Sequence, residues 1–327
     1  MKNLPTIPVF AIAAGHEPAA ESLRADPERL ALLLASARKT YTPPGMRLAD
    51  RLSRQWARHV VSPYNDAVCD VDATLGRPGA YLLNHSYEWG CTTGACEDPE
   101  QGGPTLMRVL DWPFDGLGRA LVVTRHDGGA GPYDNLTWPG YVGVLTASAP
   151  GRFAAAINQP PLPAPWGKAV GWPLARYRVA RSRAMPPSHL LRLAFDTCRT
   201  YDEAVELITK TPICIPAIYT LAGVKPGERI TIERTENHAL IAPRPAAANH
   251  WTAPGAPAGR PRNASSRARH AAMRALCDAR PDWSLGWLHA PILDRDARVV
   301  MMANAASGKL VAQGFEKTGA ATAALAL

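Results

Sequence analysis

Residues 89–93 read Trp-Gly-Cys-Thr-Thr, and residues 108–112 read Arg-Val-Leu-Asp-Trp. A cysteine followed by two hydroxyl residues, with an arginine and an aspartate about twenty positions further on, indicates a thiol nucleophile with charged partners. Cys91 lies far from the start of the chain, and no helix signal follows it. We therefore expect a cysteine that becomes useful only after the backbone is cut in front of it.

The composition is that of a soluble globular protein with a full core. The chain has 327 residues, of which 46% are hydrophobic and 20% are charged. No apolar run approaches the roughly 18 residues that span a bilayer, so no membrane segment is expected. The net charge of +8 is dispersed among acidic residues. Its densest cluster, residues 176–183, has only Tyr177 as an aromatic neighbour, so nucleic-acid binding is not expected.

Six cysteines are scattered along the chain without a CxxC pair or a Cys/His ligand spacing, so we expect no structural zinc. Pro5 and Pro8 interrupt the very short apolar stretch at the start of the chain, so we expect a first strand there rather than a signal peptide. Without a signal peptide, reduced thiols and a cytoplasmic location are the default expectation. The spacing of Cys91 and Cys96 allows them to form a redox pair, although we favour the interpretation that Cys96 is buried and unreactive. The remaining cysteines are expected to be small buried hydrophobes: Cys69, Cys198, Cys214 and Cys277.

Helical periodicity dominates residues 17–61, whereas residues 65–79 are less defined and rich in turn formers. Short apolar runs typical of strands follow from Tyr81 onward. Strands in two sets with helices in pairs between them predict an α+β, four-layer αββα sandwich with an added helical N-terminal segment. Residues 105–111 and 120–125 are expected to pair as a hairpin, as are 141–147 with 153–157, and 287–293 with 299–303. Expected helices cover residues 17–38, 46–61, 188–198, 200–209 and 265–277.

A break of the Gly90–Cys91 peptide bond would give Cys91 a free α-amino group. Such an amine titrates near ~7.7 to 8.0, so it can act as the base for its own thiol. The same thiol can cut that bond by an N-to-S acyl shift followed by hydrolysis of the thioester. Gly90 suits this reaction because it lacks a Cβ and leaves the scissile carbonyl open.

Asp111 is a candidate to hold the amine, and Arg108 to keep the surroundings of the thiolate positive. A tetrahedral intermediate also needs a donor for its oxyanion, and Asn158 and Asn249, each directly after an expected strand, are candidates. The plainer alternatives are a surface ion pair for Arg108 and Asp111, and turn residues for both asparagines.

Nearly the whole chain resembles the acid ceramidase and N-acylethanolamine acid amidase family, within the N-terminal-nucleophile hydrolases related to choloylglycine hydrolase. The segments that carry this resemblance are Cys91-Thr-Thr with Arg108-Val-Leu-Asp-Trp112, Gly140-Tyr-Val-Gly-Val-Leu-Thr146, Pro150-Gly151, Ile157-Asn-Gln159, Tyr201 to Thr211, Asn249-His-Trp251 and Ser266-Arg-Ala268.

The resemblance implies that Cys91 is the nucleophile and new N-terminus, with Arg108 and Asp111 as its partners. It further implies that Asn249 is the oxyanion donor. Asn158 and Arg267 would complete the site, and Arg260, Arg262 and Arg269 lie close to Arg267 in sequence. The chain also departs from the family pattern. Gln159 stands where the family has Glu, the segment after it is rich in proline and tryptophan, the family's disulfide cysteines have no clear match, and Gly90 replaces a larger residue.

The implied protein is a self-processing cysteine amidase that hydrolyses an N-acyl amine, such as a fatty acyl amide or ceramide-like substrate, through a thioester on Cys91. It would need no metal or organic cofactor, and would be cut into chains of residues 1–90 and 91–327 that stay associated. We expect its partner to be a small-molecule amide with an apolar acyl group, held by the segment from Gln159 to Pro187. An acyltransferase of the penicillin acyltransferase type, or a non-catalytic lipid-binding homologue, stays open.

Overall fold

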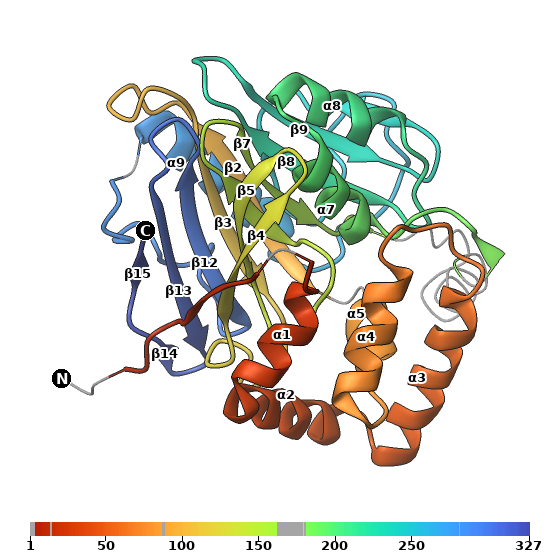
Figure 1. The fold of residues 1–327 in the computed structure, drawn as a ribbon. Helices are drawn as coiled ribbons and strands as arrows, with labels where there is room; N and C mark the ends of the chain where they lie inside the picture. Colours follow the sequence, from red (N-terminus) through yellow and green to blue (C-terminus); the bar gives the residue numbers. More distant parts are fainter. Residues whose placement is uncertain (1–3, 14, 87–88, 162–178, 180, 281) are drawn as a thin grey trace.

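Two stacked sheets form the centre of the protein (Figure 1). The structure is a computed structural model of the 327-residue chain, and it describes all residues except 1–3, 14, 87–88, 162–178, 180 and 281. Most of the segment from Gln159 to Pro187, expected to hold the acyl group, therefore lies outside the described residues.

The larger sheet has eight strands in the order β1-β4-β5-β6-β7-β8-β9-β10. All neighbours are antiparallel except β1, which runs parallel to β4 at one edge. The strands are β1 Val9–Ala11, β4 Val122–Gly128, β5 Gly131–Thr137, β6 Thr146–Ala149, β7 Phe153–Asn158, β8 Ala217–Ala222, β9 Arg229–Arg234 and β10 Ala239–Ile241.

The smaller sheet has the order β11-β2-β3-β12-β13-β14, with β15 also paired to β13. Strand β2 begins at Gly90 and pairs along its whole length with β3, so that Cys91 stands opposite Leu110. The strands are β2 Gly90–Cys96, β3 Thr105–Asp111, β11 Ala246–Ala247, β12 Ala297–Asn304, β13 Leu310–Glu316, β14 Gly319–Ala320 and β15 Leu325–Ala326.

Helices cover the outer faces of both sheets, which confirms the predicted αββα arrangement (Figure 1). Helices α7 (Pro187–Thr197) and α8 (Tyr201–Lys210) lie on the eight-stranded sheet. The Thr200 hydroxyl caps α8 by accepting a hydrogen bond from the Glu203 N–H, as the capping-box sequence predicts. Helix α9 (Ser266–Ala279) packs on β2 and β11 of the other sheet.

Five N-terminal helices pack beside this sandwich rather than within it (Figure 1). The expected helix over residues 17–38 is two helices, because Asp26 caps a new helix that Pro27 begins. The segment over residues 65–79, which carries no clear helix pattern, contains a helix whose end is closed by Gly76 in the left-handed region. The helices are α1 Pro18–Ala25, α2 Pro27–Thr40, α3 Pro43–Ala57, α4 Asn65–Leu75 and α5 Ala80–His85.

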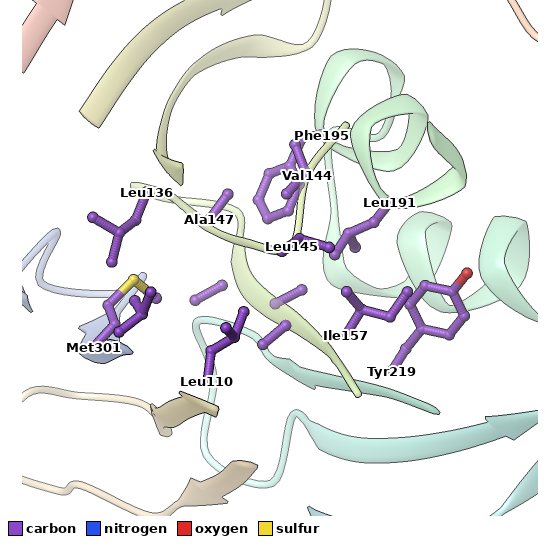
Figure 2. Packing of buried hydrophobic residues seen from close by; sticks show 14 of the residues in the cluster. Leu110, Leu136, Val144, Leu145, Ala147, Ile157, Leu191, Phe195, Tyr219 and Met301 are labelled. Carbon is purple, nitrogen blue, oxygen red and sulfur yellow. The ribbon is translucent and has the colours of Figure 1, made fainter. Parts of the chain in front are cut away.

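The main core lies between the two sheets and continues under α7 (Figure 2). Leu110 and Met301 of the seven-stranded sheet pack toward Leu136 of the other sheet, while Ile157 lies beside Tyr219 and Leu191 on the side of α7. Alternate residues of the same strands face outward, so that Met107 and Val109 join a second core beneath α9. This alternation decides which side chains of β2 and β3 can meet.

Two of the expected hairpins are wrong. Strand β3 pairs with β2 and β12, while β4 belongs to the other sheet, so residues 105–111 and 120–125 are not neighbours. Residues 287–293 form turns, and the final hairpin joins β12 to β13 instead. Strand patterns predict where strands lie, whereas pairing depends on contacts between distant segments that no local pattern encodes. The hairpin of β6 and β7 is confirmed, although β6 begins later than expected.

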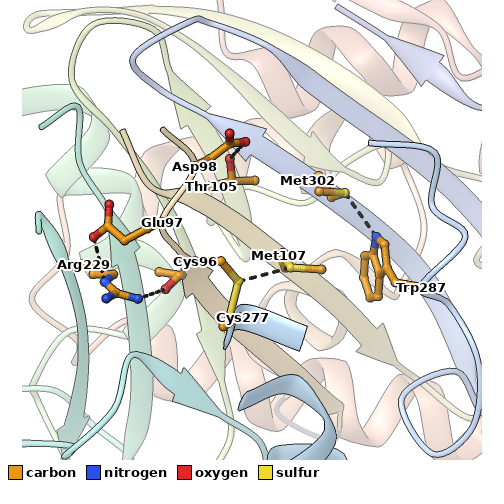
Figure 3. Close-up of a disulfide and its surroundings, with 10 residues drawn as sticks. Cys96, Glu97, Asp98, Thr105, Met107, Arg229, Cys277, Trp287 and Met302 are labelled. Carbon is orange, nitrogen blue, oxygen red and sulfur yellow. Dashed lines mark hydrogen bonds and ion pairs between the residues drawn. A yellow bond between two sulfur atoms is a disulfide. The ribbon is translucent and has the colours of Figure 1, made fainter. Parts of the chain in front are cut away.

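A disulfide joins Cys96 at the end of β2 to Cys277 near the end of α9 (Figure 3). The expectation that both are unpaired is wrong, because their 181-residue separation in sequence hides their proximity in the fold. Gly94 makes room for this contact, since a Cβ there would lie 2.8 Å from Cys277 Sγ. Disulfides persist mainly in oxidising compartments, whereas the expectation of a cytoplasmic location assumed reduced thiols. That location stays a prediction.

Candidate active site

Cys91 lies at the start of β2 with its side chain directed between the two sheets, fully buried. Its Sγ is 3.7 Å from the Ile157 carbonyl oxygen, and its N–H donates to Asn249 Oδ1 over 2.9 Å. Burial raises the pKa of the thiol to about 11, and the nearby guanidinium of Arg108 opposes this shift. In the continuous chain the thiol is therefore protonated at neutral pH.

Arg108 shares the inner face of the sheet with Cys91, because Thr93 stands opposite Arg108 and side chains alternate along both strands. Its Nη1 donates to Asn158 Oδ1 over 2.6 Å, and Asn158 Nδ2 donates to the Ala248 carbonyl over 3.2 Å. Burial lowers the pKa of Arg108, and its nearness to Cys91 opposes that shift. Asn158 thus anchors the cation that lies beside the thiol.

Asp111 lies on the opposite face of the sheet, the face that α9 covers. Its Oδ2 lies 3.1 Å from Arg269 Nη1, and both side chains are almost completely buried. Burial raises the pKa of Asp111 to about 7, and Arg269 opposes this increase. Gly90 pairs with Asp111 across the strands, so this carboxyl group lies beside the backbone that precedes Cys91 rather than facing the thiol from the inner side.

Arg269, and not Arg267, is the arginine of α9 that reaches the site. Arg267 is exposed, whereas Arg269 is fully buried. Arg269 Nη1 donates to the Cys91 carbonyl over 2.7 Å and to Thr92 Oγ1 over 2.5 Å. The side chain of Arg267 instead points to solvent, because two residues along a helix turn a side chain through about 200°, and a catalytic role for either arginine stays a prediction.

Asn249 contacts residues on both faces of the seven-stranded sheet. Its Oδ1 accepts from the Cys91 N–H and from Arg269 Nη2 over 2.8 Å, while its Nδ2 donates to the Gln159 carbonyl over 2.7 Å. Its own N–H donates to Ser266 Oγ over 2.8 Å. In the continuous chain the side-chain amide is therefore engaged, and its role as an oxyanion donor stays a prediction.

Gln159 follows β7 and lies beside this network. Its side chain is buried, and among the described residues neither its Oε1 nor its Nε2 has a hydrogen-bond partner. A buried carboxamide without partners is costly, so a group that binds here would gain from pairing with it.

The structure brings Gly90, Cys91, Arg108, Asp111, Asn158 and Asn249 together, and their catalytic roles stay predictions. Sequence reasoning named Arg269 only as a neighbour of Arg267, and it missed Asn263, whose Oδ1 accepts from Arg269 Nη2 over 2.9 Å. The network holds two buried guanidinium groups, one on each face of the sheet, and one buried carboxyl group. This excess of positive charge favours an anionic thiolate or oxyanion over the neutral form.

An apolar pocket lies between the N-terminal helices and the start of the loop after β3. Leu33, Val71 and Leu83 line it from α2, α4 and α5, and Trp112 and Phe114 close its other side. Trp112 directly follows Asp111, so this pocket begins next to the candidate site.

No helix in the described part of the chain is long and apolar enough to cross a membrane. The described residues also contain no group of three or more His, Cys, Asp or Glu side chains arranged to hold a metal ion.

Comparisons with known proteins agree with the fold. The family model described as acyl-coenzyme A:6-aminopenicillanic acid acyl-transferase matches residues 135–283. The N-acylethanolamine-hydrolyzing acid amidase of Oryctolagus cuniculus is 27% identical over 175 residues, 52% of this chain and 46% of the relative. The acid ceramidase of Pan troglodytes is 32% identical over 104 residues, 32% of this chain and 25% of the relative. This chain thus spans about half or less of these relatives.

A solved structure of the Caenorhabditis elegans N-acylethanolamine-hydrolyzing acid amidase ortholog matches with a TM-score of 0.52 and 18% identity. The match covers 66% of this chain and 93% of that one. The fold is that of the N-terminal-nucleophile hydrolases. Within that class, the chain is similar over part of its length to acid ceramidase and to the N-acylethanolamine acid amidases.

Proposed function

We propose that this protein is a self-processing cysteine amidase that uses Cys91 as its nucleophile. The observation that carries the proposal is the way the backbone around Cys91 is held. Its N–H is bound by Asn249, its carbonyl is bound by Arg269, and the preceding residue lies against Asp111. A buried strand with an ordinary structural cysteine needs none of these side-chain contacts.

In the first reaction, the Cys91 thiol loses its proton and its sulfur attacks the Gly90 carbonyl carbon. The C–N bond of Gly90–Cys91 breaks, the nitrogen takes a proton, and Gly90 becomes a thioester on Sγ. Water then hydrolyses the thioester, which releases a Gly90 carboxylate and restores the thiol. Asp111 is placed to exchange the proton with the new amine, since its pKa of about 7 is close to that of an α-amino group.

In the second reaction, the free amine of Cys91 acts as base for the thiol, which attacks the carbonyl carbon of an amide substrate. The amine of the substrate leaves with a proton, and water releases the acyl group as a carboxylate. Arg108 would stabilise the thiolate from the inner face of the sheet. The Nδ2 of Asn249, freed from the Gln159 carbonyl, would donate to the oxyanion.

We propose that the substrate carries a long apolar acyl group and that the pocket beside Trp112 receives it. That pocket is almost entirely apolar and begins one residue from Asp111. Burial of an alkyl chain contributes about 0.8 kcal/mol per methylene, so binding should strengthen with chain length until the pocket is filled. The names of the relatives, which are hydrolases of N-acylethanolamines and ceramides, agree with this class of substrate.

Contacts across the cut would hold the two chains together. Glu17 of the N-terminal segment pairs with Arg192 of α7 over 2.9 Å, and the Tyr64 hydroxyl donates to Asp196 over 2.6 Å. Both contacts are largely buried, and they join residues on either side of position 90. We therefore propose that residues 1–90 and 91–327 remain associated after cleavage.

Intact mass and N-terminal sequencing of freshly purified protein test self-processing. The wild-type protein should give two fragments beginning at Met1 and Cys91, and Cys91→Ala should give a single chain. Hydrolysis of N-palmitoyl-7-amino-4-methylcoumarin should appear only in the cut protein. A wild-type chain that stays whole at every pH, and whose Cys91 resists thiol reagents, would instead indicate a non-catalytic lipid-binding homologue.

Acyl transfer is the second candidate, and the match to the 6-aminopenicillanic acid acyl-transferase model favours it. The acyl-enzyme is the same, but an amine rather than water takes the acyl group. Product analysis with and without added hydroxylamine or ethanolamine distinguishes the two, because a transferase forms the new amide at the expense of the free acid.

A further inference from the structure

Asn263 lies in the turn before α9, where no pattern in the sequence marks it. Arg269 Nη2 donates to Asn263 Oδ1 over 2.9 Å. A guanidinium has only donors, so the oxygen of this carboxamide must face Arg269 and the Nδ2 must face away from it. Because Arg269 is fully buried and fixed by its other contacts, the orientation of the Asn263 side chain is fixed as well.

The Nδ2 of Asn263 lies against Gly90. A Cβ built on Gly90 would be 3.3 Å from this nitrogen and 3.2 Å from Asp111 Oδ2. The position beside the Gly90 Cα is thus flanked by one hydrogen-bond donor and one carboxyl oxygen. A methyl group in this position would be crowded between two polar atoms and would satisfy neither.

A hydroxyl group in the same position would meet both atoms at hydrogen-bond distance. It would accept from Asn263 Nδ2 and donate to Asp111 Oδ2, since a C–O bond is only slightly shorter than a C–C bond. Gly90 is the acyl group of the self-cleavage reaction, so its Cα corresponds to the α-carbon of an acyl group bound in the same way. A substituent on that α-carbon would point between Asn263 and Asp111.

We infer that Asn263 and Asp111 form a recognition site for the α-carbon of the acyl group, and that the site favours 2-hydroxy acyl amides. This inference rests on the proposed amidase function and deepens it. If the acyl chain follows the path of the backbone before Gly90, the hydroxyl that takes the Cβ position has the R configuration. The site then prefers the (R)-2-hydroxy acyl group over its S enantiomer, and rejects 2-methyl acyl groups.

Four 7-amino-4-methylcoumarin amides test this inference: palmitoyl, (R)-2-hydroxypalmitoyl, (S)-2-hydroxypalmitoyl and 2-methylpalmitoyl. The quantity measured is kcat/KM on the cut protein. We expect the R hydroxyamide to exceed the S form by about tenfold, as one hydrogen bond allows. We expect the 2-methyl amide to fall about tenfold or more below the unsubstituted one, as crowding of one methyl group allows.

The variants Asn263→Ala and Asn263→Asp should bring the R-to-S ratio close to one. Asn263→Asp keeps an oxygen for Arg269 but removes the donor, so it separates recognition from folding. Asn237→Ala, an exposed asparagine between β9 and β10, is the matched control and should leave the ratio unchanged. A ratio does not depend on the fraction of active enzyme, so partial unfolding of a variant cannot produce the result.

Equal rates for the R and S hydroxyamides in the wild-type protein would overturn the inference, as would an R-to-S ratio that both Asn263 variants preserve. Failure of the proposed function looks different, because the unsubstituted palmitoyl amide would then also be inert and the chain would stay whole.

Discussion

Replacement of Arg269 should be far more damaging than replacement of its neighbour Arg267. The Arg269 guanidinium is fully buried, contacts Asp111 at 3.1 Å, and donates to Cys91, Thr92 and Asn249. Breaking a buried ion pair by removing one partner costs about 3–5 kcal/mol, because the remaining charge is left without compensation. Since whole domains are stable by only about 5–15 kcal/mol, Arg269→Met should remove a large share of the stability.

Urea unfolding followed by tryptophan fluorescence measures this effect, with Cys91→Ala as the background so that the chain stays whole. Arg269→Met should lower the free energy of unfolding by about 3 kcal/mol or more. Arg267→Met should change it by less than about 0.5 kcal/mol, as expected for an exposed side chain.

The partner carboxyl group gives a stricter test. Addition of Asp111→Asn to the Arg269→Met protein should restore part of the lost stability, because the unpaired buried charge is then gone. Equal losses for Arg267→Met and Arg269→Met, or no recovery in the double variant, would refute the assignment of Arg269 as the partner of Asp111.

Three further outcomes follow from the same geometry. Removal of the disulfide by Cys96→Ser with Cys277→Ser should lower the free energy of unfolding by at most about 5 kcal/mol, which is the loop-closure value for the 181-residue separation. If reductant leaves the urea midpoint of the wild-type protein unchanged, the cross-link is contradicted. Gly90→Ala should slow self-cleavage by about tenfold, because the new Cβ would lie 3.2 Å from Asp111 Oδ2. The rate of self-cleavage is followed by intact mass, and a variant that is cut as fast as the wild-type protein would show that this contact has no effect. The pKa of Asp111 is raised from 3.8 to about 7, so the folded protein binds the proton more tightly than the unfolded chain, and this group's contribution to stability should fall as pH rises from about 4 to 7. Urea unfolding of Cys91→Ala over that range, with and without Asp111→Asn, should show the decrease only where Asp111 is present, and parallel pH profiles would argue against the shift.

Local patterns predict much of the helix and strand content because propensities and caps act over a few residues. The capping box at Thr200 and the Pro27 that begins α2 are visible in the sequence and are present in the structure. Strand pairing is different. Residues 105–111 and 120–125 are adjacent strands in sequence, yet they lie in different sheets, since the partners of β3 come from about fifteen residues before it and nearly two hundred after it.

For the candidate site, the sequence by itself indicated Cys91, Arg108 and Asp111 as a group, because of their residue types and their spacing on two consecutive strand-like runs. The pairing of those two runs as β2 and β3 came from the structure, since the sequence predicted residues 120–125 as the partner of the second run. Only the tertiary structure decided which face each side chain takes and which arginine of α9 is buried. It also decided that Cys96 bonds to Cys277 and that Asn263 lies against Gly90. These contacts join residues about 170 to 180 positions apart, and they form only because α9 packs on the sheet in one particular orientation. Residue types and their spacing in the sequence do not predict that orientation.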